Sequence, residues 1–280
     1  MIIYFIIFII PFLYYIQQTF LKKNKIILNL TIDDNKGGVR NMYLNYGNLS
    51  NNIINLFVYK KKIYIFFNLI YYLFIYNPEY IISHSKKITY ILQYIKLNTK
   101  LIHVIHGNSN YCENINYADK IFYINDYQKK QLSKLNLIHK SYYFPNFISE
   151  KIIKINYFNK KKQVKKIGLI GRFSKEKNFE TILKCMKYID MELYIAGEGD
   201  LYNKYLEIIK KYKLKNIHFL GWINSEKFFE LIDIFIIPSI DEPFGLVTLE
   251  AMRSHKAIIS SKNYGSLKIL KNYENCLFVN

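Results

Sequence analysis

Residues 234–254 read IFIIPSIDEPFGLVTLEAMRS, and this stretch decides the fold class. It begins as a short apolar run, turns at Pro243 and Gly245, and continues in a helical pattern from about Leu246. A buried strand that leads through a tight turn into a helix is typical of parallel sheets covered by helices. Ligands of such sheets bind at the carboxyl ends of the strands, where the first N–H groups of the helix favour phosphate.

The same alternation extends in both directions from this stretch. Short apolar runs that favour strands are separated by stretches of helical length. These runs lie at residues 26–32, 54–59, 80–85, 100–106 and 120–125, and then at 167–171, 192–197, 217–221, 257–261 and 276–280. The pattern predicts an α/β protein of two tandem Rossmann-like, doubly wound domains.

The domain boundaries follow from composition. Residues 151–166 are polar and rich in lysine, which is typical of a linker. We therefore expect one domain over residues 25–150 and a second over residues 167–280. Residues 1–24 form a separate apolar segment.

A second candidate site element follows the first strand of the second domain. Residues 168–178 read GLIGRFSKEKN, which places Arg172 and Lys177 between the end of a strand and the start of a helix. Arginine binds phosphate in a bidentate way and lysine supplies a mobile point charge. The alternative is a solvated basic turn, and for Lys177 alone that alternative would be preferred in a chain so rich in lysine.

These two segments resemble the family 4 retaining glycosyltransferases, which have the GT-B fold of two Rossmann-like domains. The family pattern E-P-F-G-L-V-x-L-E-A-M matches residues 242–252 residue for residue, and the loop G-R-x-x-x-x-K-N matches residues 171–178. The resemblance implies that residues 25–150 are the acceptor-side domain and residues 167–280 the nucleotide-sugar donor domain.

The resemblance also implies roles for individual residues. Arg172 and Lys177 would stabilise the leaving diphosphate, Glu242 would orient the donor sugar, and Glu250 would bind ribose. Backbone N–H groups of Gly245 and Leu246 would contact the donor, and Gly171 would border it. Retention would proceed by front-face attack without an enzyme nucleophile.

Two elements of the first domain fit the same resemblance. Gly37 and Gly38 follow the first strand like the family's G-G-V loop, which lies against the donor phosphates, although a plain tight turn explains them nearly as well. His106 follows an apolar strand where the family often has a cleft histidine near the transferred sugar. A structural role for His106 remains an equal alternative, and we expect His84 and His103 to be structural.

The chain departs from the family pattern beyond Met252. The family continues A-M-x-x-G-x-P-V, whereas His255 and Ala257 stand at the positions of the glycine and the proline. Residues 264–268, YGSLK, replace the family's G-G-x-P-E. The chain also stops at Asn280, which predicts a shortened C-terminal tail. These departures predict altered sugar specificity and support, as an alternative function, a catalytically inactive glycosyltransferase-like subunit that acts as a binding partner.

The charge of the chain does not by itself identify a partner. The formal net charge is +19 over 280 residues, with 40 Lys and Arg against 21 Asp and Glu. The lysines are dispersed, and the accompanying excess of Ile, Asn, Tyr and Phe is typical of A/T-rich codons. We therefore expect no specific nucleic-acid partner, since that would favour clustered basic residues. A basic surface still attracts anions such as nucleotide diphosphates and lipid headgroups.

The N-terminal segment leaves two alternatives open. Residues 1–16 carry no charged side chain, and Lys22, Lys23 and Lys25 follow them. The apolar run is shorter than the roughly 20 residues of a spanning helix, so it predicts either a membrane anchor or a buried first element of the fold. Both alternatives leave the catalytic part in the cytoplasm, at the cytoplasmic face of a membrane in the first case.

The sequence predicts neither a metal site nor a cofactor. The three cysteines are far apart and match no metal-ligand spacing. The D-x-D motif of metal-dependent transferases does not occur. We expect a metal-independent hexosyltransferase that uses a nucleotide-diphosphate sugar as co-substrate and needs no cofactor. Its acceptor would be a glycan or a lipid-linked glycan, as in polysaccharide biosynthesis.

Overall fold

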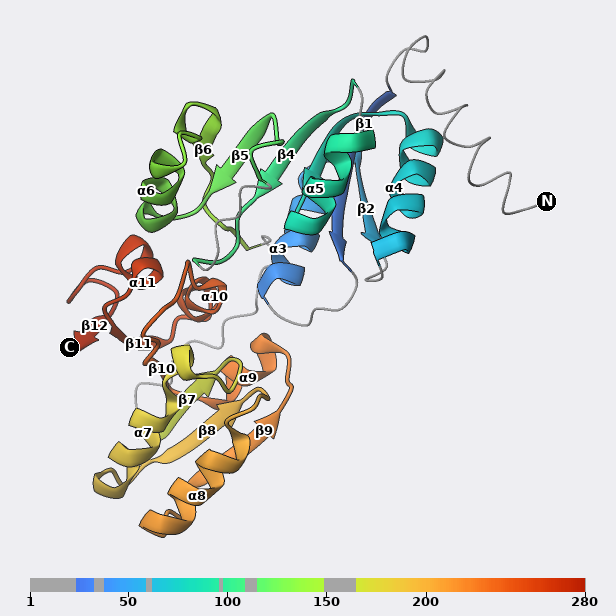
Figure 1. Ribbon diagram of the computed structural model, residues 1–280. Helices are drawn as coiled ribbons and strands as arrows, with labels where there is room; N and C mark the ends of the chain where they lie inside the picture. The colour runs from blue at the N-terminus through green and yellow to red at the C-terminus, as the bar shows by residue number, and fades with distance from the viewer. Residues whose placement is uncertain are drawn as a thin grey trace. The chain divides into compact units, whose positions relative to one another are not determined.

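The computed structural model describes residues 24–32, 38–58, 62–95, 98–108, 115–148 and 165–279. The chain divides into two compact units between Ser149 and Glu150. Each unit contains one six-stranded sheet with helices packed beside it (Figure 1). The pairings between the named strands are parallel throughout. This architecture confirms the prediction of two Rossmann-like α/β domains.

The first unit has the strand order β2-β1-β3-β4-β5-β6. Its strands are β1 (Asn24–Ile32), β2 (Ile53–Val58), β3 (Pro78–Ser83), β4 (Lys100–Val104), β5 (Lys120–Tyr123) and β6 (Ser141–Tyr143). Its helices are α3 (Gly38–Gly47), α4 (Lys62–Tyr76), α5 (Lys86–Ile95), α6 (Asp126–Lys134) and the 3-10 turn η3 (Ile138–Lys140). The direction of winding changes between β1 and β3, so a crevice is expected at the carboxyl ends of these strands.

Strand β1 separates an apolar from a polar environment. Leu28 and Leu30 are fully buried in a cluster that includes Leu69 of α4 and Leu92 of α5. Asn29 lies between them in sequence and therefore points to the opposite face of the sheet. There it is also fully buried, and its side-chain amide donates to the backbone carbonyl of Tyr43 in α3. The core strand thus carries buried polar side chains, Asn29 among them, on the face opposite to this cluster.

The second unit has the strand order β12-β11-β10-β7-β8-β9. Its strands are β7 (Lys166–Ile170), β8 (Glu192–Ala196), β9 (Ile217–Gly221), β10 (Ile234–Ile237), β11 (Ala257–Ser261) and β12 (Leu277–Val279). Its α-helices are α7 (Phe179–Cys185), α8 (Tyr202–Tyr212), α9 (Ser225–Leu231), α10 (Leu246–Arg253) and α11 (Tyr264–Ile269). Short 3-10 turns are η4 (Lys175–Lys177) and η5 (Met186–Tyr188). This order is the 3-2-1-4-5-6 order of a dinucleotide-binding sheet.

Alternation along the strands gives the second sheet two buried faces. Leu193 and Ile195 of β8 pack in one cluster with residues of α7 and α8. Ala196 packs in a second cluster with Phe228 of α9 and Ala251 of α10. Since successive side chains of a strand point to opposite faces, the helices cover both faces, as a doubly wound domain requires.

The structure also contains elements that the sequence pattern did not predict. Strand β6 and helix α11 were not expected, because each is too short to show a clear period. Residues 62–76 form an α-helix although the run is apolar almost throughout, with Leu69 and Leu73 buried and Tyr71 and Ile75 half exposed. Among the described helices, none has the length and hydropathy to cross a bilayer. The apolar residues 1–16, most of the expected linker and Gly37 lie outside the described ranges.

Candidate active site

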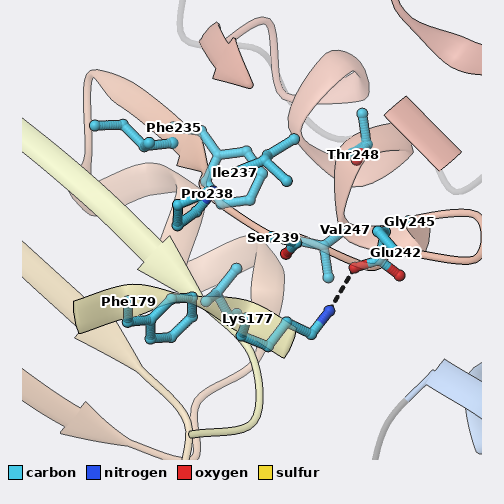
Figure 2. Close-up of a pocket in the computed structure, with 12 residues that line it drawn as sticks. Lys177, Phe179, Phe235, Ile237, Pro238, Ser239, Glu242, Gly245, Val247 and Thr248 are labelled. Carbon is cyan, nitrogen blue, oxygen red and sulfur yellow. Dashed lines mark hydrogen bonds and ion pairs between the residues drawn. The ribbon is translucent and has the colours of Figure 1, made fainter. Parts of the chain in front are cut away.

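The candidate site of the second unit lies where the winding of its sheet reverses. Strands β7 and β10 are adjacent, and the chain leaves β7 toward β8 and β10 toward β11, on opposite sides. A small pocket opens at their carboxyl ends, and Lys177, Glu242 and Gly245 are among the residues that line it (Figure 2). The structure thus brings these three residues together in one pocket, and their roles toward a donor stay predictions.

Backbone and side-chain hydrogen bonds join the two loops that border this pocket. The Ile240 N–H donates to the Glu176 carbonyl at 2.8 Å, and the Asn178 side-chain amide donates to the Pro238 carbonyl at 3.2 Å. Asn178 adopts a left-handed conformation with φ of 52°, which asparagine tolerates better than most residues. The loop after β7 is thus fixed against the loop after β10, and Lys177 lies between the bonds.

Lys177 and Glu242 form an ion pair across these loops. The Lys177 ammonium contacts Glu242 Oε2, and the two side chains are 22% and 16% exposed (Figure 2). Partial burial makes the pair less screened by salt than a surface pair. Because the pocket also opens beside it, an anionic ligand would compete with Glu242 for the lysine.

The loop that carries Glu242 depends on two glycines. Gly245 has φ of 90°, a conformation that L side chains rarely adopt, and it directly precedes helix α10. The Gly265 N–H donates to the Glu242 carbonyl at 2.8 Å, and a Cβ at Gly265 would lie 2.4 Å from the Phe244 carbonyl oxygen. Gly265 is the glycine that remains from the family's G-G-x-P-E stretch. Its role here is to let α11 approach the Glu242 loop.

Helix α10 begins at Leu246, so its first N–H groups lie at the end of this loop. Glu250 lies about one turn further along the same helix and is partly buried. Burial raises the pKa of the Glu250 carboxyl, and a hydrogen bond from Ser225 at the start of α9 acts in the opposite direction. Neither Glu250 nor Leu246 lines the small pocket beside Lys177. The structure therefore separates Glu250 from Glu242 by the loop of residues 243–245 and about one turn of α10.

Arg172 is exposed on the loop that follows β7. The turn after β8 supports this loop, because the Phe173 N–H donates to the Glu198 carbonyl at 2.8 Å. A Cβ at Gly197 would lie 1.9 Å from the Gly171 carbonyl oxygen, so only glycine fits there. The close approach of the two turns thus depends on Gly197, whereas a Cβ at Gly171 would make only ordinary contacts, the nearest at 3.5 Å. The A-G-E-G turn of residues 196–199 is part of the scaffold that holds Arg172.

In the first unit, His106 is not isolated. His84 follows β3 and His106 follows β4, and these strands are neighbours, so the two rings meet at one end of the sheet. His84 Nδ1 lies 2.7 Å from His106 Nε2, and the rings stack with centroids 4.9 Å apart. Gly38 is the exposed first residue of α3, and no role for it follows from its surroundings.

Burial keeps this histidine group neutral. Burial, with smaller effects of His106 and His103, lowers the pKa of His84 well below its ordinary value. Burial also lowers the pKa of His103 to about 3 and that of His106 to about 4. We predicted that His84 is structural, but the sequence did not show its contact with His106. The available signal was that both follow consecutive apolar strands, whose carboxyl ends are adjacent in a parallel sheet.

The departures from the family pattern have local structural explanations. His255 has φ of 51° and is the second residue after the end of α10, where its N–H donates to the Met252 carbonyl. Glycine is favoured at such a position because of the left-handed backbone. The Lys256 ammonium donates to the Ile232 carbonyl, and Ala257 begins β11. These departures alter a helix end and a strand start.

No three His, Cys, Asp or Glu side chains come together as a metal site would require, within the residues described. The groups that the candidate site of the second unit offers are Lys177, Arg172 and a helix N-terminus, together with two carboxylates. This is a set of groups that can bind a phosphate-bearing ligand with hydroxyl groups.

Comparison with known proteins identifies what this chain is similar to. Residues 149–280 match the family of glycosyl transferases group 1. An uncharacterized glycosyltransferase of Methanocaldococcus jannaschii is 35% identical over 125 residues, which are 41% of this chain and 32% of that protein. The lipopolysaccharide core biosynthesis glycosyltransferase LpsE of Rhizobium meliloti is 25% identical over 113 residues, 39% of this chain and 33% of LpsE. The matched stretches thus span about a third of these relatives.

A solved structure shares the fold over both units. HepE of Anabaena in complex with UDP-glucose superposes with a TM-score of 0.75 at 13% identity, over 92% of this chain and 86% of HepE. At this identity the likeness shows the fold alone. The chain therefore has the two-domain architecture of HepE.

Proposed function

Residues 149–280 carry a glycosyl transferases group 1 domain, and from this premise we propose that the chain transfers a hexose-type sugar from a nucleotide-diphosphate sugar. The acceptor is a glycan or a lipid-linked glycan, and the transfer retains the configuration of the sugar. The observation that carries the proposal is the Lys177–Glu242 pair at the junction of β7 and β10. It places a cation and a carboxylate where a doubly wound sheet binds its ligand.

The cations supply the chemistry that sugar transfer needs. When the bond between sugar and diphosphate breaks, negative charge develops on the leaving diphosphate. Arg172 and Lys177 lie on one loop and can stabilise this charge together with the first N–H groups of α10, without a metal ion. Since Lys177 already pairs with Glu242, the diphosphate would take over the lysine and release the carboxylate. Glu242 would then accept hydrogen bonds from the sugar hydroxyls.

Glu250 would hold the other end of the donor. A carboxylate can accept hydrogen bonds from both hydroxyls of a ribose, and Glu250 lies on the helix whose N-terminus follows the Glu242 loop. The separation of Glu250 from Glu242 by a loop and one helical turn fits a ligand with a sugar at one end, phosphates in the middle and a nucleoside at the other. No cofactor beyond this co-substrate is part of the proposal.

The named relatives suggest which donor to test first and which kind of biosynthesis the enzyme serves. HepE was solved with UDP-glucose, and LpsE is named for lipopolysaccharide core biosynthesis. We propose polysaccharide biosynthesis at the cytoplasmic face of a membrane for this chain also. The net charge of +19 supports attraction to both a nucleotide diphosphate and anionic lipid headgroups.

Ligand-observed NMR on the full chain tests the donor site. UDP, GDP, ADP and their sugars are screened against the parent chain, Arg172→Ala and Glu250→Ala. Lys175→Ala is the matched control, because Lys175 is an exposed lysine of the same turn. We expect one nucleotide to bind the parent and the control, and both site variants to lose most of this binding.

The opposite result would be binding of no nucleotide to a chain whose circular dichroism shows that it is folded. That outcome would favour the alternative function, a catalytically inactive glycosyltransferase-like subunit that acts as a binding partner. Once a donor is known, the anomeric configuration of the product, read from its proton couplings, tests retention. Activity that survives an excess of EDTA tests metal independence.

A further inference from the structure

The first unit contains a hydrogen-bond chain that leads from a buried backbone carbonyl to His106. Asn29 Nδ2 lies 2.7 Å from the Tyr43 carbonyl oxygen and 2.7 Å from Asn55 Oδ1. A backbone carbonyl can only accept, so the Asn29 amide nitrogen must face it. Asn29 Oδ1 is then the atom that lies 2.8 Å from His84 Nε2.

This anchor determines the tautomer of His84. Because Asn29 Oδ1 accepts, His84 Nε2 must carry a proton and donate it. A buried imidazole with no carboxylate bonded to it stays neutral, so it carries one ring proton only. His84 Nδ1 is therefore an acceptor, and the proton in the 2.7 Å contact with His106 belongs to His106 Nε2.

The hydrogen bond from His106 to His84 also determines the protonation state of the remaining ring nitrogen of His106. A neutral His106 that donates through Nε2 has an unprotonated Nδ1. Nδ1 makes no hydrogen bond to the described part of the chain, and the ring is only partly buried. Its lone pair is thus available at the carboxyl end of β4, in the region where the first sheet would bind a ligand.

We infer that His84, itself oriented by Asn29, is a positioning residue that holds His106 in the tautomer whose Nδ1 accepts a hydrogen bond from a hydroxyl group of the bound sugar. This inference rests on the proposed function for the identity of the ligand. It explains why a fully buried asparagine stands in the apolar strand β1, since Asn29 determines which ring nitrogen of His84 carries the proton.

The aromatic rings packed around His84 are uncharged, which is consistent with neutral His84 and His106 rings. Tyr43 and Tyr46 of α3 pack edge-on against the His84 ring, with centroids 5.8 Å and 5.1 Å away. Burial raises the pKa of both tyrosines, so they too stay uncharged. His103 is the other titratable ring nearby, and Lys86 acts on His103.

His103 provides an internal contrast. Ser83 Oγ donates to the Ser85 carbonyl, Thr89 Oγ1 donates to Ser83 Oγ, and His103 Nδ1 lies 2.8 Å from Thr89 Oγ1. The single hydroxyl proton of Thr89 is already used, so His103 must donate through Nδ1. The structure therefore assigns opposite tautomers to His103 and to the pair His84 and His106.

Nitrogen-15 NMR of the histidine rings in the full chain tests this assignment without any substrate. We expect His84 and His106 to be protonated on Nε2 and His103 on Nδ1 at neutral pH. Exposed His139 serves as the reference for a ring that exchanges between tautomers. A His106 signal protonated on Nδ1, or averaged like that of His139, would overturn the inference.

Two variants then connect the tautomer to activity. His84→Phe keeps an aromatic ring and removes both nitrogens, so the His106 signal should become averaged and kcat/KM should fall about tenfold, the effect of one lost orienting hydrogen bond. Thr89→Val is the matched control, because it removes a buried hydrogen bond that does not reach His106.

A double-mutant cycle separates positioning from mere support of the fold. If His84 acts through His106, adding His84→Phe to His106→Ala should lower kcat/KM no further. Two losses that multiply would show that His84 acts independently and would refute the positioning role. Failure of the proposed function would appear separately, as absent nucleotide binding with the expected ring spectrum.

Discussion

The two units use opposite means to present polar groups at the carboxyl ends of their strands. In the second unit, charged side chains stand on loops that glycines and backbone bonds hold in place, as for Lys177 and Glu242. In the first unit, neutral side chains are joined in a buried chain from Asn29 to His106. The difference fits two tasks, since a diphosphate calls for cations and a sugar calls for directed hydrogen bonds. Each prediction below tests one side of this comparison.

The largest effect is expected at Lys177. Lys177→Met removes the cation that would meet the leaving diphosphate and leaves Glu242 partly buried without this partner. Removal of one such stabilising group costs about 10²–10³ in kcat. Steady-state kinetics with the identified donor measure the loss, and Lys175→Met in the same turn is the control. Unchanged kcat in Lys177→Met would mean that the charged loops of the second unit are not the site.

Gly265 tests whether the loops of the second unit must be held rigidly. In Gly265→Ala, the new Cβ would lie 2.4 Å from the Phe244 carbonyl oxygen and 2.7 Å from the Glu242 carbonyl oxygen. Overpacking of this kind costs typically about 1–3 kcal/mol in the free energy of unfolding. Urea denaturation measures this loss.

A matched glycine in the first unit is the control for Gly265. A Cβ at Gly107 would meet no atom within 4 Å, so Gly107→Ala should change stability by less than about 0.5 kcal/mol. Equal losses at both positions would show that the contact of Gly265 with the Glu242 loop has no special weight. A loss confined to Gly265→Ala would confirm that α11 supports the site.

The two units also differ in how much of them could be predicted from the sequence. Each segment of the candidate site in the second unit is encoded locally, because Pro243, Gly245 and the apolar strand before them specify a turn at a strand end. The Lys177–Glu242 pair that joins two such segments spans 65 positions and was not predicted. The predicted strands over residues 217–221 and 257–261 agree with β9 and β11 at both ends. Strand β6 and helix α11 were missed, since three to six residues hold too little of a period.

In the first unit, the resemblance made His106 a candidate, but its hydrogen-bond partners could not be predicted because the bonds join distant residues. Asn29 and His84 are 55 positions apart, and His84 and His106 are 22 apart. Besides the two histidines that follow consecutive apolar strands, a further signal is the asparagine within the apolar run IILNLTI. A polar side chain in a strand that is expected to be buried requires a partner, but nothing in the pattern identifies which residue supplies it.

The pH dependence of nucleotide binding tests Glu250. Burial raises the pKa of its carboxyl, so protonation begins at a higher pH than for an ordinary glutamate. Only the ionised form accepts from both ribose hydroxyls, and nucleotide affinity should therefore fall as the pH is lowered through this raised pKa. Glu250→Gln should weaken binding about tenfold at neutral pH, which is the loss of one hydrogen bond to a charged group.

The raised pKa of Glu250 also determines how its contribution to the free energy of unfolding changes with pH. A carboxyl whose pKa is higher in the folded state than in the unfolded state binds its proton more tightly when folded, so its contribution to stability decreases as the pH rises. Glu250→Gln removes this penalty and should not lower the melting temperature at neutral pH. Isothermal titration calorimetry and thermal melts between pH 5 and about 8 measure both effects. Unchanged nucleotide affinity in Glu250→Gln would exclude Glu250 as the ribose ligand.

The smallest effect is expected at His255. This residue ends α10 in a left-handed conformation with φ of 51°, which costs a non-glycine residue about 1–2 kcal/mol. His255→Gly relieves that strain but makes the unfolded chain more flexible, so we expect a net gain of about 0.5–1 kcal/mol in unfolding free energy. Since the side chain is at a helix end, kcat/KM and the preferred sugar should not change. A switch of donor sugar in His255→Gly would show that the departure from the family pattern reaches the ligand, and that the helix end belongs to the site.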